Sequence, residues 1–328
     1  MKVPVVSFGA WAIGGWMWGG TDDAAAIKAI QTAIDCGITC IDTAPIYGMG
    51  HSETVVGKAI AGRRDGLVIA TKCGVRWDTD KGRKSIESQM PDGRPVDIHR
   101  YLGPDSILRE CEQSLQRLGV DVIDLYQCHW PDPTTPIGDT MDALLKLRDQ
   151  GKIRAIGVSN FTPELMDECL DYAPLASNQP PYNPLQRDIE ADVVPFCLEH
   201  NIGLLAYSPI AQGLMTGKVT MDREFPEDDV RSKRPWFKRE NRRRVLDALA
   251  QIQPIADGHG ATLAQVAIQW VVSQPGITSA LVGARNPQQA SENAKAADIQ
   301  LTGEELGLIR ELVEGLGEPD QTDNPRRN

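Results

Sequence analysis

Short apolar runs alternate along this chain with longer stretches in which apolar residues recur at helical spacing. The runs are rich in β-branched residues and carry few charges, which is typical of parallel strands buried on both faces. We therefore expect eight strands joined by helices. The strands are Val5–Ala10, Thr39–Asp42, Leu67–Thr71, Val122–Gln127, Ile153–Ser159, Ala173–Asn178, Gly203–Tyr207 and Thr278–Val282.

Residues that favour helix starts mark several of the amphipathic stretches. Thr21-Asp22, Ser52 with Glu53, Pro104-Asp105 and Thr162-Pro163 stand where the first, second, third and fifth helices are expected to begin. Their side-chain oxygens can accept hydrogen bonds from the free N–H groups of a first turn, and proline fits that turn without loss. Cap chemistry and hydrophobic spacing thus agree on repeated βα units.

Eight such units follow one another without a break in composition. This pattern predicts an α/β protein in which residues 1–328 form a single (β/α)8 TIM barrel domain, with residues 315–328 as a flexible polar tail. An open, doubly wound sheet is the alternative. The segment Gly9–Gly15 after the first strand lacks the G-x-G-x-x-G spacing expected of a dinucleotide-binding sheet of that kind.

The amino-acid composition limits which binding partners and which cellular location we expect for the protein. The net charge of −11 argues against nucleic acid and anionic membranes as partners, because neutralising phosphate requires a surplus of Lys and Arg. No apolar run approaches the roughly 20 residues of a membrane span, and Met1–Ala10 lacks a signal-peptide pattern, so we expect a cytoplasmic protein. The seven cysteines show no CxxC pair and no zinc-like spacing, which predicts reduced thiols and no metal site.

Two long segments follow predicted strands and are expected to be loops. They are Cys73–Gly103 and Ala211–Glu240. Active sites of such barrels are built from the loops at the carboxyl ends of the strands. We therefore expect the functional site at this end of the barrel.

Chemically complementary side chains cluster at these strand ends. Asp42, Lys72 and His129 each end or directly follow a predicted strand, and Tyr47 lies in the loop after Asp42. A phenol with a pKa of about 10 is a weak acid at neutral pH, but an adjacent ammonium held by a carboxylate would lower that pKa. The imidazole of His129 could orient a carbonyl oxygen and stabilise the negative charge that develops on it. Each residue alone has a structural explanation, such as a turn cap or a surface lysine, but four together favour catalysis.

At these residues the chain resembles the aldo-keto reductases. The matching segments are Gly9-Ala10-Trp11, Ile41–Gly48 with Ser52-Glu53, Thr71-Lys72, Asp124–Pro131, Ile156–Phe161, and Tyr207–Ile210 with Gly213-Leu214. The run Trp11–Gly20 is most similar to the bacterial branch that includes general stress protein 69-like reductases. The resemblance implies an NADP-dependent oxidoreductase that reduces aldehydes and ketones to alcohols, reversibly, on the CH-OH group of donors. Asp42, Tyr47, Lys72 and His129 would be its catalytic tetrad, with Tyr47 as general acid in reduction and general base in oxidation.

The resemblance also assigns the NADP(H) site. Ser159, Asn160 and Gln179 would bind the nicotinamide amide, Tyr207 would stack on its ring, and Trp11 would pack beneath it. Ser208, Gly213, Leu214 and Lys218 would hold the pyrophosphate, and Gly283, Arg285, Gln289, Glu292 and Asn293 the adenosine end. A guanidinium at Arg285 can pair with a 2′-phosphate, which favours NADPH over NADH.

Other aromatic and basic residues have looser assignments. Trp18, Trp77 and Trp130 are expected to line the substrate pocket, and Trp16 could be either pocket wall or core. The basic run Arg231–Arg244 is interpreted as a solvated helix face, with a loop over the cofactor phosphates as the alternative.

Several alternatives remain at this stage. Only about eight residues precede Gly9-Ala10-Trp11, so we expect no N-terminal hairpin of the kind that usually plugs barrels of this family. Either the sequence starts late or the barrel floor is covered in another way. A cofactor-binding sensor or auxiliary channel subunit with little turnover, and a hydrolase or isomerase using Asp42 and His129, are the rival functions. A monomer is the expected state, with an oligomer left open.

Overall fold

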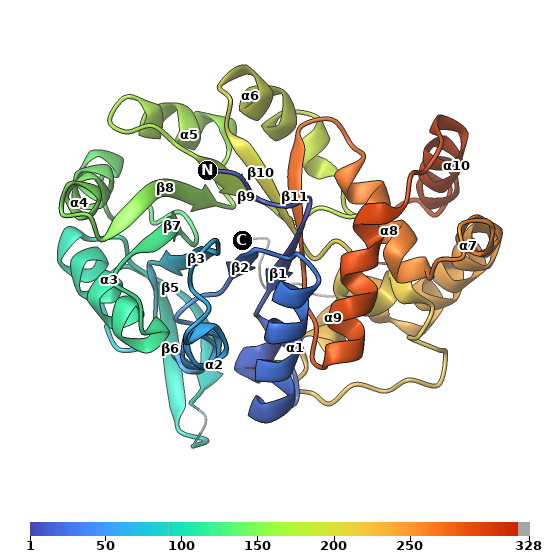
Figure 1. The fold of residues 1–328 in the computed structure, drawn as a ribbon, viewed down its shortest axis with the longest axis horizontal. Coiled ribbons are helices and arrows are strands. Elements are labelled where there is room, and N and C mark those ends of the chain that lie inside the picture. Colours follow the sequence, from blue (N-terminus) through green and yellow to red (C-terminus); the bar gives the residue numbers. More distant parts are fainter. Residues whose placement is uncertain (91, 321–328) are drawn as a thin grey trace.

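The computed structural model describes residues 1–90 and 92–320, and its centre is a closed barrel of eight parallel strands (Figure 1). In spatial order the strands are β1, β2, β3, β7, β8, β9, β10 and β11, and β11 pairs with β1. Their bounds are Val6–Gly9, Cys40–Asp42, Val68–Cys73, Ile123–Cys128, Ile153–Ser159, Ser177–Gln179, Gly203–Tyr207 and Ile277–Val282. The (β/α)8 prediction is confirmed, and the eight expected strands lie within a few residues of the observed ones.

Helices surround the barrel on its outer side (Figure 1). They are α1 Asp23–Asp35, α2 His51–Ile60, α3 Pro104–Leu118, α4 Ile137–Asp149, α5 Pro163–Leu170, α6 Val193–Glu199, α7 Arg239–Gly258, α8 Leu263–Val272, α9 Pro287–Ala294 and α10 Gly303–Glu314. The caps expected at Asp22 and Thr162 are present and accept hydrogen bonds from the first turns of α1 and α5. The cap expected at Ser52 is wrong, because α2 begins at His51 and buries both Ser52 and Glu53.

The segment Cys73–Gly103 is not the loop that its sequence indicates. It contains β4 (Val75–Arg76), β5 (Arg83–Gln89) and β6 (Pro95–Arg100), which form a small antiparallel sheet in the order β4-β6-β5. One face of this sheet packs over the barrel mouth, where Ile86 and Ile98 meet Ile46 and Trp16. The prediction failed because β5 carries one aliphatic residue among polar ones, so its strand pattern is weak.

The N-terminal segment lies at the amino ends of the strands, where a plug was expected to be missing. Within Met1–Val5 the described chain forms no strand. Instead Val3 packs against the interior side chains Leu125, Leu205 and Leu281, and the Pro4 carbonyl accepts a hydrogen bond from Ser279. Val3 therefore covers part of the barrel floor.

The segment Ala211–Glu240 crosses back toward the loop after β1. It contains three short 3-10 helices, and Val230 N donates to Met17 O at 3.1 Å. Arg242 is 7% exposed and donates to the carbonyls of Thr220, Arg223 and Phe237. The solvated-face interpretation of the basic run is therefore wrong for Arg242, whose guanidinium organises this segment.

The C-terminal segment begins as an ordered continuation of α10. Asp320 N donates to Asn241 Oδ1 at 3.2 Å, which ties this point to α7. The rest of the predicted polar tail, residues 321–328, lies outside the described residues. Among the described helices, none is both long and apolar enough to cross a membrane.

Candidate active site

A cavity of about 920 Å³ opens at the carboxyl ends of the barrel strands. Its walls come from the loop after β1, the β4–β6 sheet, the loop after β7, and the segments that follow β10 and β11. Asp42, Tyr47 and His129 line it, whereas Lys72 lies just behind them with no exposed surface. The structure therefore brings the four predicted catalytic residues together.

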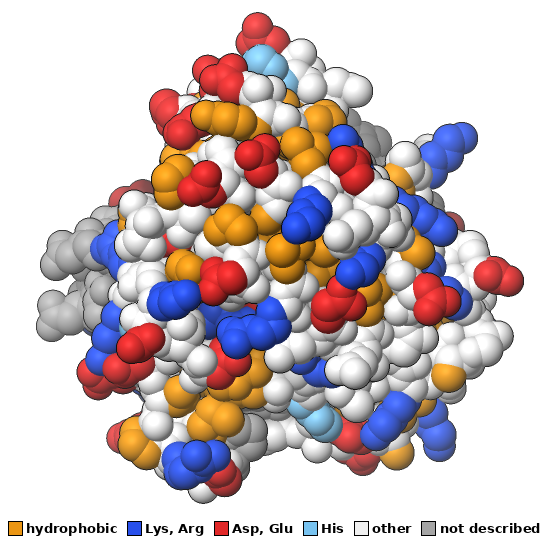
Figure 2. All heavy atoms as spheres, turned by 90° about the vertical axis from the view of Figure 1, so that its left-hand side faces the viewer, with side chains coloured by type: hydrophobic (Ala, Val, Ile, Leu, Met, Phe, Trp, Pro, Cys, Tyr) orange, Lys and Arg blue, Asp and Glu red, His pale blue; other side chains and the backbone are white. Residues whose placement is uncertain are grey.

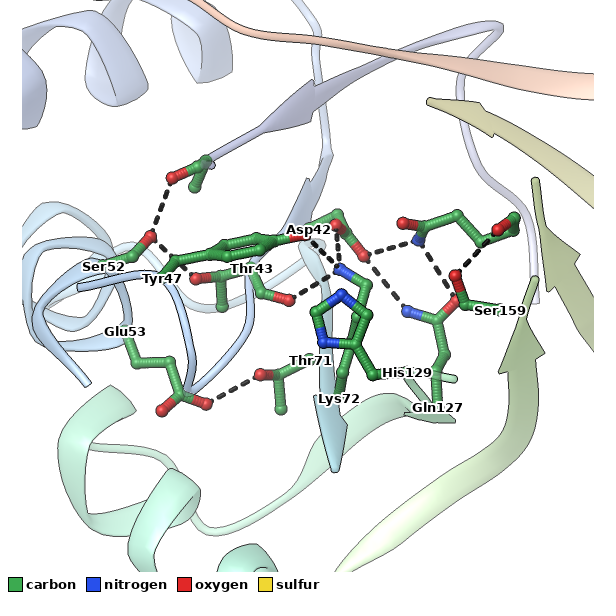
Figure 3. A network of polar contacts seen from close by, with 12 residues as sticks. Asp42, Thr43, Tyr47, Ser52, Glu53, Thr71, Lys72, Gln127, His129 and Ser159 are labelled. Carbon is green, nitrogen blue, oxygen red and sulfur yellow. Dashed lines mark hydrogen bonds and ion pairs between the residues drawn. The ribbon is translucent and has the colours of Figure 1, made fainter. Parts of the chain in front are cut away.

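Lys72 is the centre of this group (Figure 3). Its Nζ donates to Asp42 Oδ1 at 2.5 Å, to the Thr43 carbonyl at 2.9 Å and to the Tyr47 hydroxyl at 3.2 Å. The ring of His129 meets the Tyr47 ring edge-on, with 5.7 Å between centroids. The phenol thus lies between a buried ammonium and an imidazole and faces the cavity.

Two glycines allow the loop that carries Tyr47 to pack this closely. A Cβ atom on Gly14 would lie 2.5 Å from the Tyr47 carbonyl carbon, and one on Gly48 would lie 2.2 Å from the Gly14 oxygen. Gly48 also has a φ of 70°, a conformation that glycine adopts without strain. Ser52 holds the other side of the loop through hydrogen bonds to Thr43 and to the Ala10 carbonyl.

The second oxygen of Asp42 is held by two buried amides. Gln127 Nε2 donates to Asp42 Oδ2 at 3.1 Å and Gln179 Nε2 donates to the same oxygen at 2.9 Å. Gly157 makes this meeting possible, because a Cβ there would lie 3.0 Å from the Gln127 side chain. Sequence reasoning missed Gln127, although its position on a strand two residues before His129 places it on the same side of β7.

Burial dominates the proton affinities of the site. It raises the pKa of Tyr47 well above its usual value, and the charge of Asp42 adds to this. The expectation that Lys72 lowers the phenol pKa is therefore wrong for this structure. Burial also lowers the pKa of Lys72, against the opposing effect of Asp42, and lowers the pKa of His129 well below its usual value, with Lys72 and Arg100 contributing. The phenol is protonated and the imidazole neutral at pH 7.

The residues predicted to bind the nicotinamide form one hydrogen-bonded group beside the tetrad. Ser159 Oγ donates to the Gln179 carbonyl at 2.7 Å, Asn160 Nδ2 donates to the His129 carbonyl at 3.1 Å, and the Tyr207 hydroxyl donates to Asn160 Oδ1 at 3.0 Å. The cavity is lined by Ser159, Asn160, Gln179 and Tyr207, together with Trp11. This group connects the predicted cofactor site to the catalytic residues directly.

The predicted pyrophosphate segment has an unusual backbone. Ser208, Ala211 and Gln212 adopt left-handed φ values of 56°, 48° and 56°, and Gly213 has a φ of 96°. Such conformations cost free energy in residues other than glycine and cluster at binding sites. A Cβ on Gly213 would meet nothing within 4 Å, so its backbone faces open space. Leu214 does not line the cavity, because its side chain is buried in the core.

The predicted adenosine residues lie in the loop before α9 and along that helix. Arg285 donates its backbone N–H to Gln289 and its guanidinium to the Gly20 carbonyl at 2.7 Å, which joins this loop to the one after β1. Lys218 Nζ lies 3.7 Å from Glu292 Oε2. Arg285, Lys218, Gln289 and Glu292 all line the cavity, as do Gly283 and Asn293.

The tryptophans divide between cavity and packing. Trp18 and Trp130 line the cavity, and Trp16 does so as well, which resolves its two interpretations in favour of the wall. Trp77 is not part of the lining and packs with Ile46 beside the small sheet.

Sequence reasoning missed the lining residues that the two inserted segments contribute. These are Val75, Arg83, Lys84, Ser85, Ile86, Ile98 and Arg100 from the first, and Gln212, Thr216, Val219, Arg223, Arg231 and Arg234 from the second. The length of the two segments after strands signalled this region but not its individual residues. For Arg231 and Arg234 the alternative interpretation of the basic run, a segment over the cofactor, is the closer one.

Comparison with known proteins agrees with this geometry. The model of the aldo/keto reductase family matches residues 5–314. An NADH-specific methylglyoxal reductase of Escherichia coli is 39% identical over 95% of this chain and 95% of its own length. The structure superposes with a TM-score of 0.86 on a glycerol dehydrogenase of Gluconobacter oxydans (40% identity; 98% of this chain and 95% of that one). It superposes with a TM-score of 0.72 on an aldo/keto reductase of Klebsiella pneumoniae in complex with NADP and acetate (30% identity; 98% and 94%). The chain belongs to the aldo/keto reductase family and is an oxidoreductase of that type.

Proposed function

We propose that this protein reduces aldehydes and ketones to alcohols with NADPH, with Tyr47 as the proton donor. The observation that carries the proposal is the position of Lys72 Nζ between Asp42 Oδ1 and the Tyr47 hydroxyl, 2.5 Å and 3.2 Å away, behind a phenol that faces the cavity. A hydrolase would need an activated nucleophile or a metal. This arrangement instead suits proton transfer to a developing alkoxide.

The side chains of the site divide the work of reduction. The cofactor supplies a hydride to the carbonyl carbon when it is bound. The Tyr47 hydroxyl donates its proton to the carbonyl oxygen, and the neutral His129 donates a hydrogen bond to the same oxygen. Lys72 stabilises the phenolate that remains on Tyr47 after transfer, so the high pKa of the resting phenol keeps the proton in place until negative charge develops. Oxidation of an alcohol would run through the same groups in reverse.

The walls of the cavity suit a nicotinamide dinucleotide. Amide and hydroxyl groups of Ser159, Asn160 and Gln179 lie beside the tetrad, and the backbone at Gly213 faces open space, so a pyrophosphate can approach it closely. NADPH is favoured over NADH because Arg285 and Lys218 place positive charge near the adenosine end. The NADH specificity of the Escherichia coli relative makes this cofactor preference a point to test.

Absorbance of NADPH with 4-nitrobenzaldehyde, measured for wild type, Tyr47→Phe and Tyr172→Phe, tests the catalytic assignment. Tyr172 is 50% exposed on the outer surface, so its variant controls for loss of a hydroxyl as such. Tyr47→Phe should lower kcat by about 10²- to 10⁴-fold, the usual contribution of a positioned acid, while NADPH binding measured by fluorescence stays. Equal turnover in wild type and Tyr47→Phe, with NADPH still bound, would instead identify a cofactor-binding sensor.

The ratio of kcat/KM for NADPH to kcat/KM for NADH tests the cofactor preference. We expect wild type to favour NADPH and Arg285→Gln to lower the ratio by about 10- to 100-fold, because a charge-assisted hydrogen bond contributes about 1.5–3 kcal/mol. A wild-type ratio below one would place this chain with its NADH-specific relative.

A further inference from the structure

We propose that the carbonyl substrate carries an anionic group, a carboxylate or a phosphate, and that Arg83 and Arg100 of the β5–β6 hairpin bind it. The inference rests on the proposed reductase function and narrows its substrate class. The side chains that line the cavity are mostly cationic, whereas the whole chain has a net negative charge.

The chain has a net charge of −11, and the face in Figure 2 intermixes acidic and basic side chains. The cavity is different, because eight cationic side chains line it against two carboxylates. The cations are Arg83, Lys84, Arg100, Lys218, Arg223, Arg231, Arg234 and Arg285, and the carboxylates are Asp42 and Glu292. A concave site lined by one sign of charge concentrates ligands of the other sign.

These cations fall into two groups on different parts of the chain. Lys218 and Arg285 belong to the segments after β10 and β11, and Arg223, Arg231 and Arg234 belong to the segment that joins β10 to α7. The cofactor's phosphates account for positive charge there. Arg83, Lys84 and Arg100 instead lie on the sheet inserted after β3, next to the aromatic wall and apart from the proposed cofactor residues.

The two arginines are placed directly opposite each other. Arg83 pairs with Arg100 in the antiparallel ladder, so their side chains share a face. Arg100 is two residues from Ile98, which packs toward Tyr47, so this shared face is the one turned to the barrel mouth. Two guanidinium groups that share a face can both donate hydrogen bonds to one carboxylate or phosphate. Lys84, which also lines the cavity, pairs with the hairpin carboxylates Glu87 and Asp97.

Arg100 also lies close to the reacting groups. Its guanidinium is 4.4 Å from the centroid of the Trp130 ring, and Trp130 directly follows His129. The positive charge of Arg100 contributes to the low pKa of His129, which requires the two groups to be near each other. A substrate whose oxygen accepts from Tyr47 and His129 can therefore extend its anionic end along Trp130 to the arginine pair.

Matched substrates can isolate this recognition from the reduction itself. 4-Carboxybenzaldehyde and 4-nitrobenzaldehyde have the same shape but differ in charge. Glyceraldehyde 3-phosphate and glyceraldehyde differ by the phosphate group that only the first of them carries. For each pair the quantity to measure is the ratio of kcat/KM for the anionic to the neutral carbonyl. The ratio cancels differences in carbonyl reactivity when it is compared between wild type and variants.

Arg83→Gln and Arg100→Gln should each lower the anionic-to-neutral ratio by about 10- to 100-fold, mainly through KM, and Arg100→Lys should restore part of it. Arg94→Gln is the matched control, because Arg94 is on the same hairpin, is 72% exposed and pairs with Asp92. The pair of substrates with the larger fall identifies carboxylate or phosphate as the bound group. Far-ultraviolet circular dichroism of each variant checks the fold.

The outcomes separate this inference from the function on which it rests. If the double variant Arg83→Gln/Arg100→Gln keeps the ratio of Arg94→Gln while neutral aldehydes are still reduced, the anion site is wrong and the reductase stands. If wild type reduces none of the four carbonyls, the proposed function fails and the substrate class with it. Added salt should lower the ratio in wild type and leave it unchanged in the double variant.

Discussion

The strand-end tetrad and the two inserted segments both border the cavity, but they are held in place very differently. Asp42 and Lys72 belong to paired barrel strands and are almost fully buried, and the Tyr47 loop is fixed by close glycine contacts. The β4–β6 sheet and Ala211–Glu240 carry exposed arginines and reach the barrel through few bonds, such as Trp16 to Ser88 and Val230 to Met17. The rigid region therefore supports the proton chemistry, and the attached segments are free to set what binds.

Removing the lysine at the centre of the rigid region should have the largest effect. Lys72→Met leaves Asp42 buried without its ion-pair partner, so we expect a loss of about 3–5 kcal/mol in the free energy of unfolding. The kcat for carbonyl reduction should also fall, to the level of Tyr47→Phe or lower, because Tyr47 loses the ammonium that stabilises its phenolate. Urea denaturation and NADPH oxidation measure the two effects.

Lys152→Met is the control for this variant. Lys152 pairs with Glu112 at the outer surface, where an ion pair contributes only about 0–1 kcal/mol. A Lys72→Met protein as stable as Lys152→Met would show that the tetrad is not held by its buried charge pair, and the contrast between the two regions would be lost.

A smaller effect is expected at the amide clamp on Asp42. Gln127→Leu removes one of two donors to Asp42 Oδ2, which should cost about 1–3 kcal/mol in the free energy of unfolding. The carboxylate then holds Lys72 less firmly, so kcat should fall several-fold while KM for the cofactor changes little. Asn178→Leu removes another buried amide bond, to the Phe161 carbonyl, and should lower stability without changing kcat. Equal loss of kcat in both variants would make Gln127 purely structural.

The sequence was sufficient to predict the rigid region. Eight short apolar runs and their caps define the barrel, and strand ends of a barrel converge, so Asp42, Lys72 and His129 can be placed together with Tyr47 from the sequence alone. The expected cofactor positions also line the cavity, apart from Leu214, whose side chain is in the core. Periodicity is informative here because each of these elements is buried on a definite face.

The attached segments could not be predicted, because periodicity reveals only elements that are buried on a definite face. The strand β5 is mostly exposed and polar, so no hydrophobic alternation marks it, and the pairing of Arg83 with Arg100 depends on a bulge between Lys84 and Ile86. The phenol pKa was also predicted with the wrong sign. The ammonium of Lys72 was visible in the sequence, but the burial that outweighs it is a property of the packed site.

The neutral imidazole gives a pH-dependent prediction of intermediate size. The folded pKa of His129 lies below its unfolded pKa of about 6.5, so the unfolded chain binds the extra proton as pH falls below that value. His129 therefore lowers stability below pH 6.5, by at most about 1.4 kcal/mol per pH unit. Urea denaturation from pH 8 to pH 5 should show a shallower loss for His129→Gln than for wild type. His200→Gln, on the outer surface, should follow wild type, and parallel curves for all three proteins would mean that folding does not lower the pKa of His129.

The smallest effect is expected where an inserted segment meets the loop after β1. Trp16 Nε1 donates to Ser88 Oγ at 3.0 Å. This partly buried bond stabilises the hairpin in its place over the barrel mouth by about 0.5–1.5 kcal/mol. Trp16→Phe and Ser88→Ala should each raise KM for 4-carboxybenzaldehyde about two- to tenfold, with little change in kcat, because the arginine pair moves and the tetrad does not. The double variant should raise KM no further than the larger single effect, since both changes break the same bond. Additive effects would mean that Trp16 and Ser88 act separately and not through their hydrogen bond. A fall in kcat that matches the rise in KM would mean that the hairpin and the tetrad move as one body and that binding and chemistry are not divided between the two regions.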